Sequence, residues 1–95
     1  PAEGAAQMRT AMRQVVTSGT GRVLADHPIA IAGKTGTAEV DGQRSHSWFV
    51  GFAPFSGKQR VAFAVIVEHA GYGARVAAPV AGDIVGAART FGLIQ

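Results

Sequence analysis

Apolar residues in the first part of the chain repeat with the spacing of an amphipathic helix. From Glu3 to Thr17 they recur at offsets of 3, 4, 7 and 8 residues, and polar side chains fall toward the other side. Ser18-Gly19-Thr20-Gly21 ends the pattern, because glycine supplies the left-handed geometry that often terminates a helix. The pattern predicts a helix over residues 3–17 with one buried stripe, formed by Ala5, Met8, Met12, Val15 and Val16.

The middle of the chain shows the alternation typical of β-strands, interrupted by turn signals. A strand pattern runs over residues 29–40 and meets Asp41-Gly42, which predicts a hairpin because both central positions of a tight turn favour positive φ. A second strand is expected over residues 47–53. A turn at residues 56–58 then leads to a third strand over residues 61–68.

Apolar side chains occupy both faces of the third strand. A strand with one solvated face would instead alternate apolar and polar residues. We therefore expect this strand to lie inside a sheet that is covered on both sides. The two faces consist of Val61, Phe63, Val65 and Val67 on one side and Ala62, Ala64 and Ile66 on the other.

A final helix is predicted to start near Ala77, with Pro79 in its first turn, where the missing N–H does no harm. Its buried stripe is predicted to consist of Val80, Ile84, Ala88 and Phe91. The order of elements is helix, three antiparallel strands, helix. This order predicts the α/β class in the broad sense, and α+β by strict usage.

The composition changes the picture in one respect. The chain has 95 residues, 47% hydrophobic and 16% charged, with no cysteine. These values exclude intrinsic disorder, a thiolate metal site and a disulfide framework. No apolar run approaches the roughly 20 residues of a membrane span. So little charge on so short a chain predicts that residues 1–95 form one segment of a larger domain, or half of a tight complex, with no second domain.

The charge pattern does not favour nucleic acid as a partner. The formal net charge is +3, but the basic residues are scattered and form no run or single basic face. The histidines at positions 27, 46 and 69 lie far apart without metal-ligand spacing, so no metal site is expected. The basic residues are Arg9, Arg13, Arg22, Lys34, Arg44, Lys58, Arg60, Arg75 and Arg89.

Residues 33–37, Gly-Lys-Thr-Gly-Thr, fit poorly with simple packing of a strand. Glycine weakens a strand and often marks a close approach by another backbone. Lys34 offers a cation, and Thr35 and Thr37 offer hydroxyl donors around Gly36. This array suits an anionic ligand that lies along the strand. The alternative is an exposed edge strand whose lysine prevents edge-to-edge pairing.

A phosphate-binding P-loop also contains Gly-Lys-Thr, but the pattern fails here. The P-loop pattern requires a second glycine five residues before Gly33, but that position is occupied by Pro28. It also requires a helix directly after the threonine. The chain continues instead as a strand toward the hairpin.

The cluster matches the K-T-G element of serine enzymes that react with penicillins. Ala32-Gly33-Lys34-Thr35-Gly36-Thr37-Ala38-Glu39 and the stretch from Ser47 to Pro54, S-W-F-V-G-F-A-P, resemble the C-terminal part of a penicillin-binding protein transpeptidase domain. Residues 12–16, Gly19-Thr20-Gly21 and the valine-rich strand are also similar to that family. The resemblance covers nearly the whole chain.

The resemblance implies a role for each residue of the cluster. Lys34 would supply positive potential and assist the proton relay around the nucleophile. Thr35 and Thr37 would bind the carboxylate of a D-alanyl-D-alanine terminus or of a β-lactam, and the Thr37 N–H would be one oxyanion-hole donor. Gly36 would allow the substrate to approach the strand. The substrate peptide would then pair with this strand through main-chain hydrogen bonds and so add a strand to the sheet. No cofactor or metal is implied.

Two motifs of the family are missing. No serine is followed by a lysine three residues later, and the chain has no asparagine for the S-x-N motif. The rest of the domain is therefore the expected partner. It would supply the nucleophilic serine, its lysine, the S-x-N motif and the other strands of a five-stranded sheet. The resemblance also implies that the terminal helix of this chain packs on one face of that sheet and the earlier helix on the opposite face. This chain alone is not expected to be catalytic.

The resemblance implies a peptidoglycan D,D-transpeptidase at the extracytoplasmic face of the bacterial cell membrane, anchored elsewhere in the full chain. Three alternatives stay open: a β-lactamase or D,D-carboxypeptidase with the same strand, a non-catalytic β-lactam sensor, and a purely structural half of a split domain.

Overall fold

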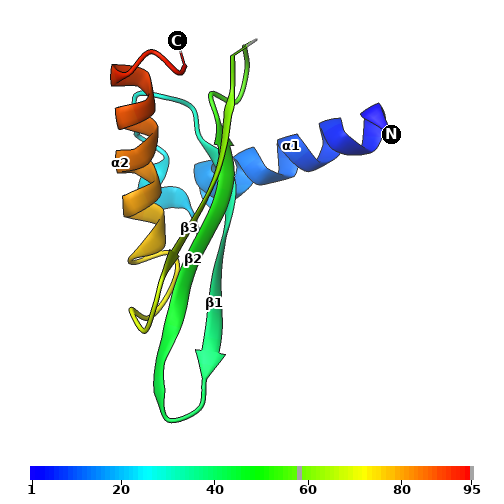
Figure 1. Ribbon diagram of the computed structural model, residues 1–95. Helices are drawn as coiled ribbons and strands as arrows, with labels where there is room; N and C mark the ends of the chain where they lie inside the picture. Colours follow the sequence, from blue (N-terminus) through cyan, green and yellow to red (C-terminus); the bar gives the residue numbers. More distant parts are fainter. Residues whose placement is uncertain (58, 95) are drawn as a thin grey trace.

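The computed structural model describes residues 1–57 and 59–94 and contains two helices, a short 3₁₀-helix and three strands (Figure 1). The elements are α1 (Ala2–Ser18), η1 (Arg22–Leu24), β1 (Ala32–Val40), β2 (Gln43–Ala53), β3 (Val61–Val67) and α2 (Ala77–Thr90). The predicted α+β class and element order are confirmed. Neither α1 nor α2 has both the length and the apolarity to cross a membrane.

The three strands form one antiparallel sheet in the order β1-β2-β3. In its register Gly36 lies opposite Trp48, which in turn lies opposite Ile66. The hairpin at Asp41-Gly42 is confirmed, but of its two residues only Gly42 has positive φ, at +70°. The turn predicted at residues 56–58 reaches Lys58, which lies outside the described residues.

The strands differ from the predicted ranges at their ends. Residues 29–31 precede the sheet, although Ile29 and Ile31 are both buried. The second strand begins earlier than expected, at Gln43, and the third ends at Val67. The alternating pattern correctly predicted that the side chains of Ile29 and Ile31 are buried, but pairing with β2 begins only at Ala32.

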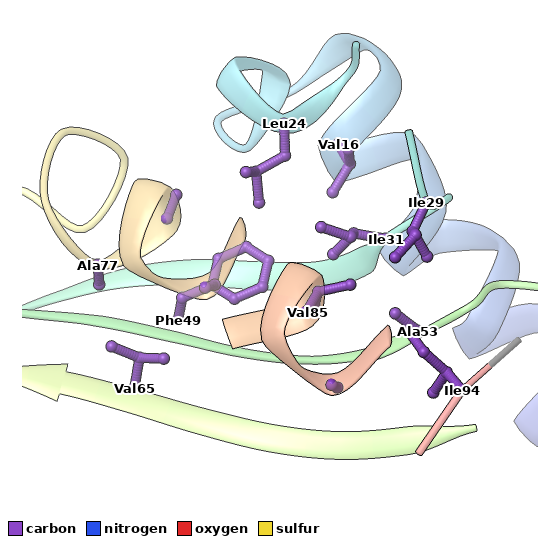
Figure 2. Packing of buried hydrophobic residues seen from close by; sticks show 13 residues of the cluster. Val16, Leu24, Ile29, Ile31, Phe49, Ala53, Val65, Ala77, Val85 and Ile94 are labelled. Atoms are coloured by element: carbon purple, nitrogen blue, oxygen red, sulfur yellow. The ribbon is translucent and has the colours of Figure 1, made fainter. Parts of the chain in front are cut away.

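One face of the sheet packs against α2 and forms the core (Figure 2). Phe49 of β2 is fully buried at the centre of this core, and Val65 of β3 is 7% exposed. The Phe49 ring stacks on Phe63 with the ring centroids 5.9 Å apart. Burial of such side chains supplies most of the stabilisation that a small domain has.

The opposite face of β3 is not covered, in contrast to the prediction. Ala62, Ala64 and Ile66 are exposed, Ile66 to 68%. Both faces of β3 are apolar, but within the described residues no element packs over β3 on that side. We call this surface, formed by Val50, Ala62, Ala64 and Ile66, the bare face.

The buried side of α2 also differs from the prediction. Val80, Ile84 and Phe91 are 37%, 39% and 80% exposed, and of the predicted stripe only Ala88 is buried. The helix instead turns small residues inward because it lies close to its neighbours: a Cβ on Gly82 would lie 2.9 Å from Leu24. The buried residues are Ala77, Ala78, Ala81, Gly82, Val85 and Ala88.

Helix α1 contacts the rest of the chain mainly through its C-terminal part, and its N-terminal part extends away from the sheet (Figure 1). Of the predicted stripe only Val16 is buried, and Met8 is 62% exposed. Gly19 follows the helix with φ −106°, so left-handed geometry is not its role. A Cβ there would lie 2.9 Å from the Val15 carbonyl oxygen, so glycine permits a close approach instead.

Candidate active site

The K-T-G residues lie on β1, an edge strand. Within residues 1–57 and 59–94, β1 pairs with β2 alone. An edge strand leaves alternate N–H and C=O groups of its outer side without a partner strand. The geometry is therefore suited to pairing with an extended peptide, as the sequence predicts.

Lys34 is exposed and lies on the side of the sheet that includes the bare face. Its cross-strand neighbour is Val50, and its ammonium donates a hydrogen bond of 2.8 Å to the Thr35 carbonyl oxygen. The ammonium is thus held along its own strand and remains accessible to solvent.

Trp48 occupies the space beside Gly36. A Cβ on Gly36 would lie 1.8 Å from two indole carbons of Trp48, a distance that no side chain tolerates. On the other side of the sheet, a Cβ on Gly73 would lie 2.3 Å from the Gly36 carbonyl oxygen. Glycine at position 36 is therefore required by the chain's own packing, whatever ligand approaches it.

The two threonines lie on the side of β1 opposite to Lys34, because neighbouring residues of a strand alternate between faces. Thr35 is 5% exposed, and its hydroxyl lies 2.5 Å from the hydroxyl of Thr20. The Thr37 hydroxyl accepts a hydrogen bond of 3.3 Å from the Gly73 N–H. The structure therefore separates the cation of the cluster from its two hydroxyls, so the single array predicted from the sequence is divided between the two faces of the sheet.

A pocket of about 400 Å³ lies on the threonine side, between the segment after α1 and the loop after β3. It is lined by Thr20, Arg22, Val23 and Ala74. The Arg22 guanidinium donates a hydrogen bond of 3.1 Å to the Gly19 carbonyl oxygen. Neither periodicity nor a motif in the sequence assigns a role to Arg22. The local signal is the neighbouring Gly19-Thr20-Gly21 motif, which belongs to the family resemblance.

The remaining candidate residues do not form a catalytic group. Ser47 is fully buried and accepts a hydrogen bond of 3.0 Å from the Ala77 N–H, at the start of α2. His46 and His69, which are distant in sequence, meet with ring centroids 4.6 Å apart. Among the residues that the structure describes, no three potential metal ligands gather.

Comparison with known proteins extends this picture. A family model described as the penicillin binding protein transpeptidase domain matches residues 1–86. The chain is 42% identical over 92 residues to the peptidoglycan D,D-transpeptidase MrdA of Acinetobacter baumannii, covering 78% of this chain and 14% of that protein. It is 36% identical over 92 residues to the stage V sporulation protein D of Bacillus subtilis, covering 87% and 14%.

Solved structures agree with these relatives. The fold matches Pseudomonas aeruginosa PBP2 in complex with WCK 5153 with a TM-score of 0.74 and 44% identity, covering 83% of this chain and 18% of that one. It matches the D,D-transpeptidase domain of a peptidoglycan glycosyltransferase from Eggerthella lenta with a TM-score of 0.69 and 36% identity, covering 90% and 20%. The chain spans a small part of each protein that it matches. With most of its residues covered by the family model, this chain belongs to the penicillin-binding protein transpeptidase domain family.

Proposed function

We propose that this chain is the K-T-G-bearing portion of a peptidoglycan D,D-transpeptidase, which cross-links cell-wall stem peptides and binds β-lactams. The observation that carries the proposal is the position of residues 33–37 on an edge strand with an unpaired outer side, in a chain of this family. The relatives named as D,D-transpeptidases support the reaction type.

The proposed reaction has two steps. A serine oxygen from the rest of the domain bonds to the carbonyl carbon of the penultimate D-alanine, the C–N bond breaks, and the terminal D-alanine leaves with the serine's proton on its amine. An amine of a second stem peptide then attacks the acyl-enzyme, loses a proton and returns it to the serine. A β-lactam stops after the first step, because its amine remains tethered.

Residues of β1 would assist the first step from one side. Lys34 would provide positive potential beside the nucleophile, which is consistent with its exposed position on β1. The Thr37 N–H would donate to the developing oxyanion, an interaction whose loss typically costs about 10²–10³ in rate. The Thr35 and Thr37 hydroxyls would serve the carboxylate of the acyl donor. Gly36 would keep the strand flat against the substrate backbone.

Two other activities share this strand. A β-lactamase or D,D-carboxypeptidase differs in using water as the acyl acceptor, and a β-lactam sensor differs in not turning over. The names of the relatives favour the transpeptidase. We place the complete protein at the extracytoplasmic face of the bacterial membrane, where its proposed substrate lies, with its anchor in another part of the sequence.

The proposal is tested by labelling the complete protein with a fluorescent penicillin. Lys34→Ala should slow acylation by orders of magnitude, because the positive charge beside the nucleophile is lost. Arg89→Ala is the matched control, since Arg89 is an exposed cation in the last turn of α2. Near-normal labelling of Lys34→Ala would contradict the role of Lys34, and an unlabelled unaltered protein would contradict the activity itself.

A further inference from the structure

A second pocket lies where the start of β2 meets the loop between β3 and α2. Its volume is about 380 Å³. Two arginines, Arg44 from β2 and Arg75 from the loop, line this pocket, and no carboxylate is among its lining residues. The pocket therefore offers positive charge without an internal counter-ion, which suits an anionic group.

The backbone of the loop holds both arginines in place. The Arg44 Nη2 donates a hydrogen bond of 3.4 Å to the Ala70 carbonyl oxygen, and the Arg44 carbonyl oxygen accepts one of 3.0 Å from His69 Nδ1. The Arg75 N–H donates a hydrogen bond of 3.0 Å to the Tyr72 carbonyl oxygen. A guanidinium carries five N–H donors in a planar fork, so both side chains keep donors for a carboxylate.

The remaining lining of the pocket suits a peptide better than an inorganic anion. The side chain of Tyr72 is 65% exposed, and Ala70 and Val76 add apolar surface beside the two cations. An exposed tyrosine next to arginines is typical of surfaces that bind peptides and proteins. The volume also leaves room for more than a single carboxylate.

The pocket lies close to the K-T-G residues but is separate from the strand that carries them. Gly73, which follows Tyr72, donates its N–H to the Thr37 hydroxyl at 3.3 Å. Ser45 lines the pocket and lies two residues, or about 7 Å, from Ser47, the cross-strand partner of Thr37. No residue of β1 lines the pocket. A donor peptide paired with the outer side of β1 therefore leaves the pocket open to a second molecule.

We propose that this pocket binds the acyl acceptor, through the C-terminal carboxylate of the second stem peptide. The inference rests on the proposed function and deepens it, because it gives the acceptor a site in this chain. Binding there holds the acceptor amine near the acyl-enzyme and so favours its attack over hydrolysis. The amine nitrogen bonds to the acyl carbon, the C–O bond to the serine breaks, and a proton of the amine passes to the serine oxygen.

The same pocket bears on the choice between the related activities. A β-lactamase or a D,D-carboxypeptidase uses water as the acyl acceptor and needs no site for a second peptide. A transpeptidase must hold two peptides at once, one on the outer side of β1 and one elsewhere. Arg44 and Arg75 provide charge for the second peptide outside β1.

The test measures how the acyl-enzyme of the complete protein divides between transfer and hydrolysis. The donor is an N-acetylated peptide that ends in D-alanyl-D-alanine and has no amine. The acceptor is a stem-type peptide with a side-chain amine and a single C-terminal D-alanine, used as the acid and as the neutral C-terminal carboxamide. Chromatography with mass spectrometry quantifies both products. Their ratio does not depend on how fast the acyl-enzyme forms, so it reports on the acceptor.

In the unaltered protein, the transfer-to-hydrolysis ratio should be higher for the acid than for the carboxamide. Arg75→Gln should lower the ratio for the acid about 10-fold, as for loss of a charged hydrogen bond, and the ratio for the carboxamide far less. Arg75→Lys should restore part of the loss. Arg44→Gln should act in the same direction, and it answers the question if Arg75→Gln does not fold. Arg89→Gln is the control, and both of its ratios should match those of the unaltered protein.

Equal ratios for the two acceptors in the unaltered protein would overturn the inference, as would equal losses for both in Arg75→Gln. Slower consumption of the donor with both ratios unchanged would show that the pocket serves the donor, which also overturns it. If the unaltered protein hydrolyses the donor but transfers it to neither acceptor, the proposed transpeptidase activity itself fails, which is a different result from loss of preference for the acid.

Discussion

The two faces of the sheet differ in how much of their apolar surface this chain covers. Under α2, Phe49 is fully buried and Val65 is 7% exposed. On the bare face the adjacent Ile66 is 68% exposed and Val50 is 39% exposed. Both faces carry residues of the same kind, so the difference lies in the segment that packs on each. An exposed apolar surface of this type marks an interaction site, and we expect the rest of the domain to cover it.

The K-T-G strand has polar side chains on both faces of the sheet, and the two faces differ in where the hydrogen-bond partners of these side chains come from. Thr35 and Thr37 lie on the side whose hydrogen-bond partners come from this chain, at Thr20 and Gly73. Lys34 lies on the other side, where its ammonium has only its own strand as partner among the described residues. The chain therefore fixes the hydroxyls by itself, whereas the surroundings of the ammonium depend on the remainder of the domain.

Removing the centre of the covered face should have the largest effect on stability. Phe49→Ala in the complete domain leaves a cavity under α2 and should lower the free energy of unfolding by about 3–5 kcal/mol. Urea unfolding followed by circular dichroism measures this change. Phe91→Ala is the control, because Phe91 is 80% exposed and should change stability by less than about 0.5 kcal/mol. Equal effects of the two variants would contradict the observed core.

The sequence predicted the elements better than their buried sides. Periodicity identified both helices and all three strands, since each has apolar residues at a regular spacing. It chose the large residues Val80 and Ile84 as the inner side of α2, but the close packing against Leu24 selects Ala81 and Gly82 instead. Hydrophobic periodicity alone does not show how closely two elements approach each other, so the buried side of α2 could be identified only from the structure.

The candidate site was predicted in part for a related reason. The motif identified residues 33–37, and the strand assignment placed them correctly on β1. Alternation already implied that Lys34 and Thr35 face opposite sides, but the contact between Thr20 and Thr35 is visible only in the structure, where the turn after α1 lies beside β1. No spacing in the sequence connects position 20 to position 35, so that neighbour was not predictable.

The bare face can be tested directly in the complete domain. Ile66→Ala should cost about 2–5 kcal/mol there if another segment covers this face as we expect, since Ile66 would then be a buried residue. Val65→Ala is the matched variant on the covered face. A cost for Ile66→Ala below about 0.5 kcal/mol would show that the face remains exposed in the full protein.

The contact between Gly36 and Trp48 should give the smallest of these effects. Gly36→Ala places a Cβ 1.8 Å from the indole and forces Trp48 to move, at a cost of about 1–3 kcal/mol. Gly86→Ala is the control: it is a helical glycine with nothing within 4 Å of the added Cβ, and should stabilise the protein by about 0.4–1 kcal/mol.

A double variant separates this contact from a general weakness of glycine replacement in β1. Trp48→Ala removes the ring that the new methyl group would meet, so Gly36→Ala should cost much less in that background. Residues in contact typically show coupling of about 0.5–3 kcal/mol in such a cycle. Additive losses would show that the cost of Gly36→Ala does not come from the indole, and would overturn this account of the contact.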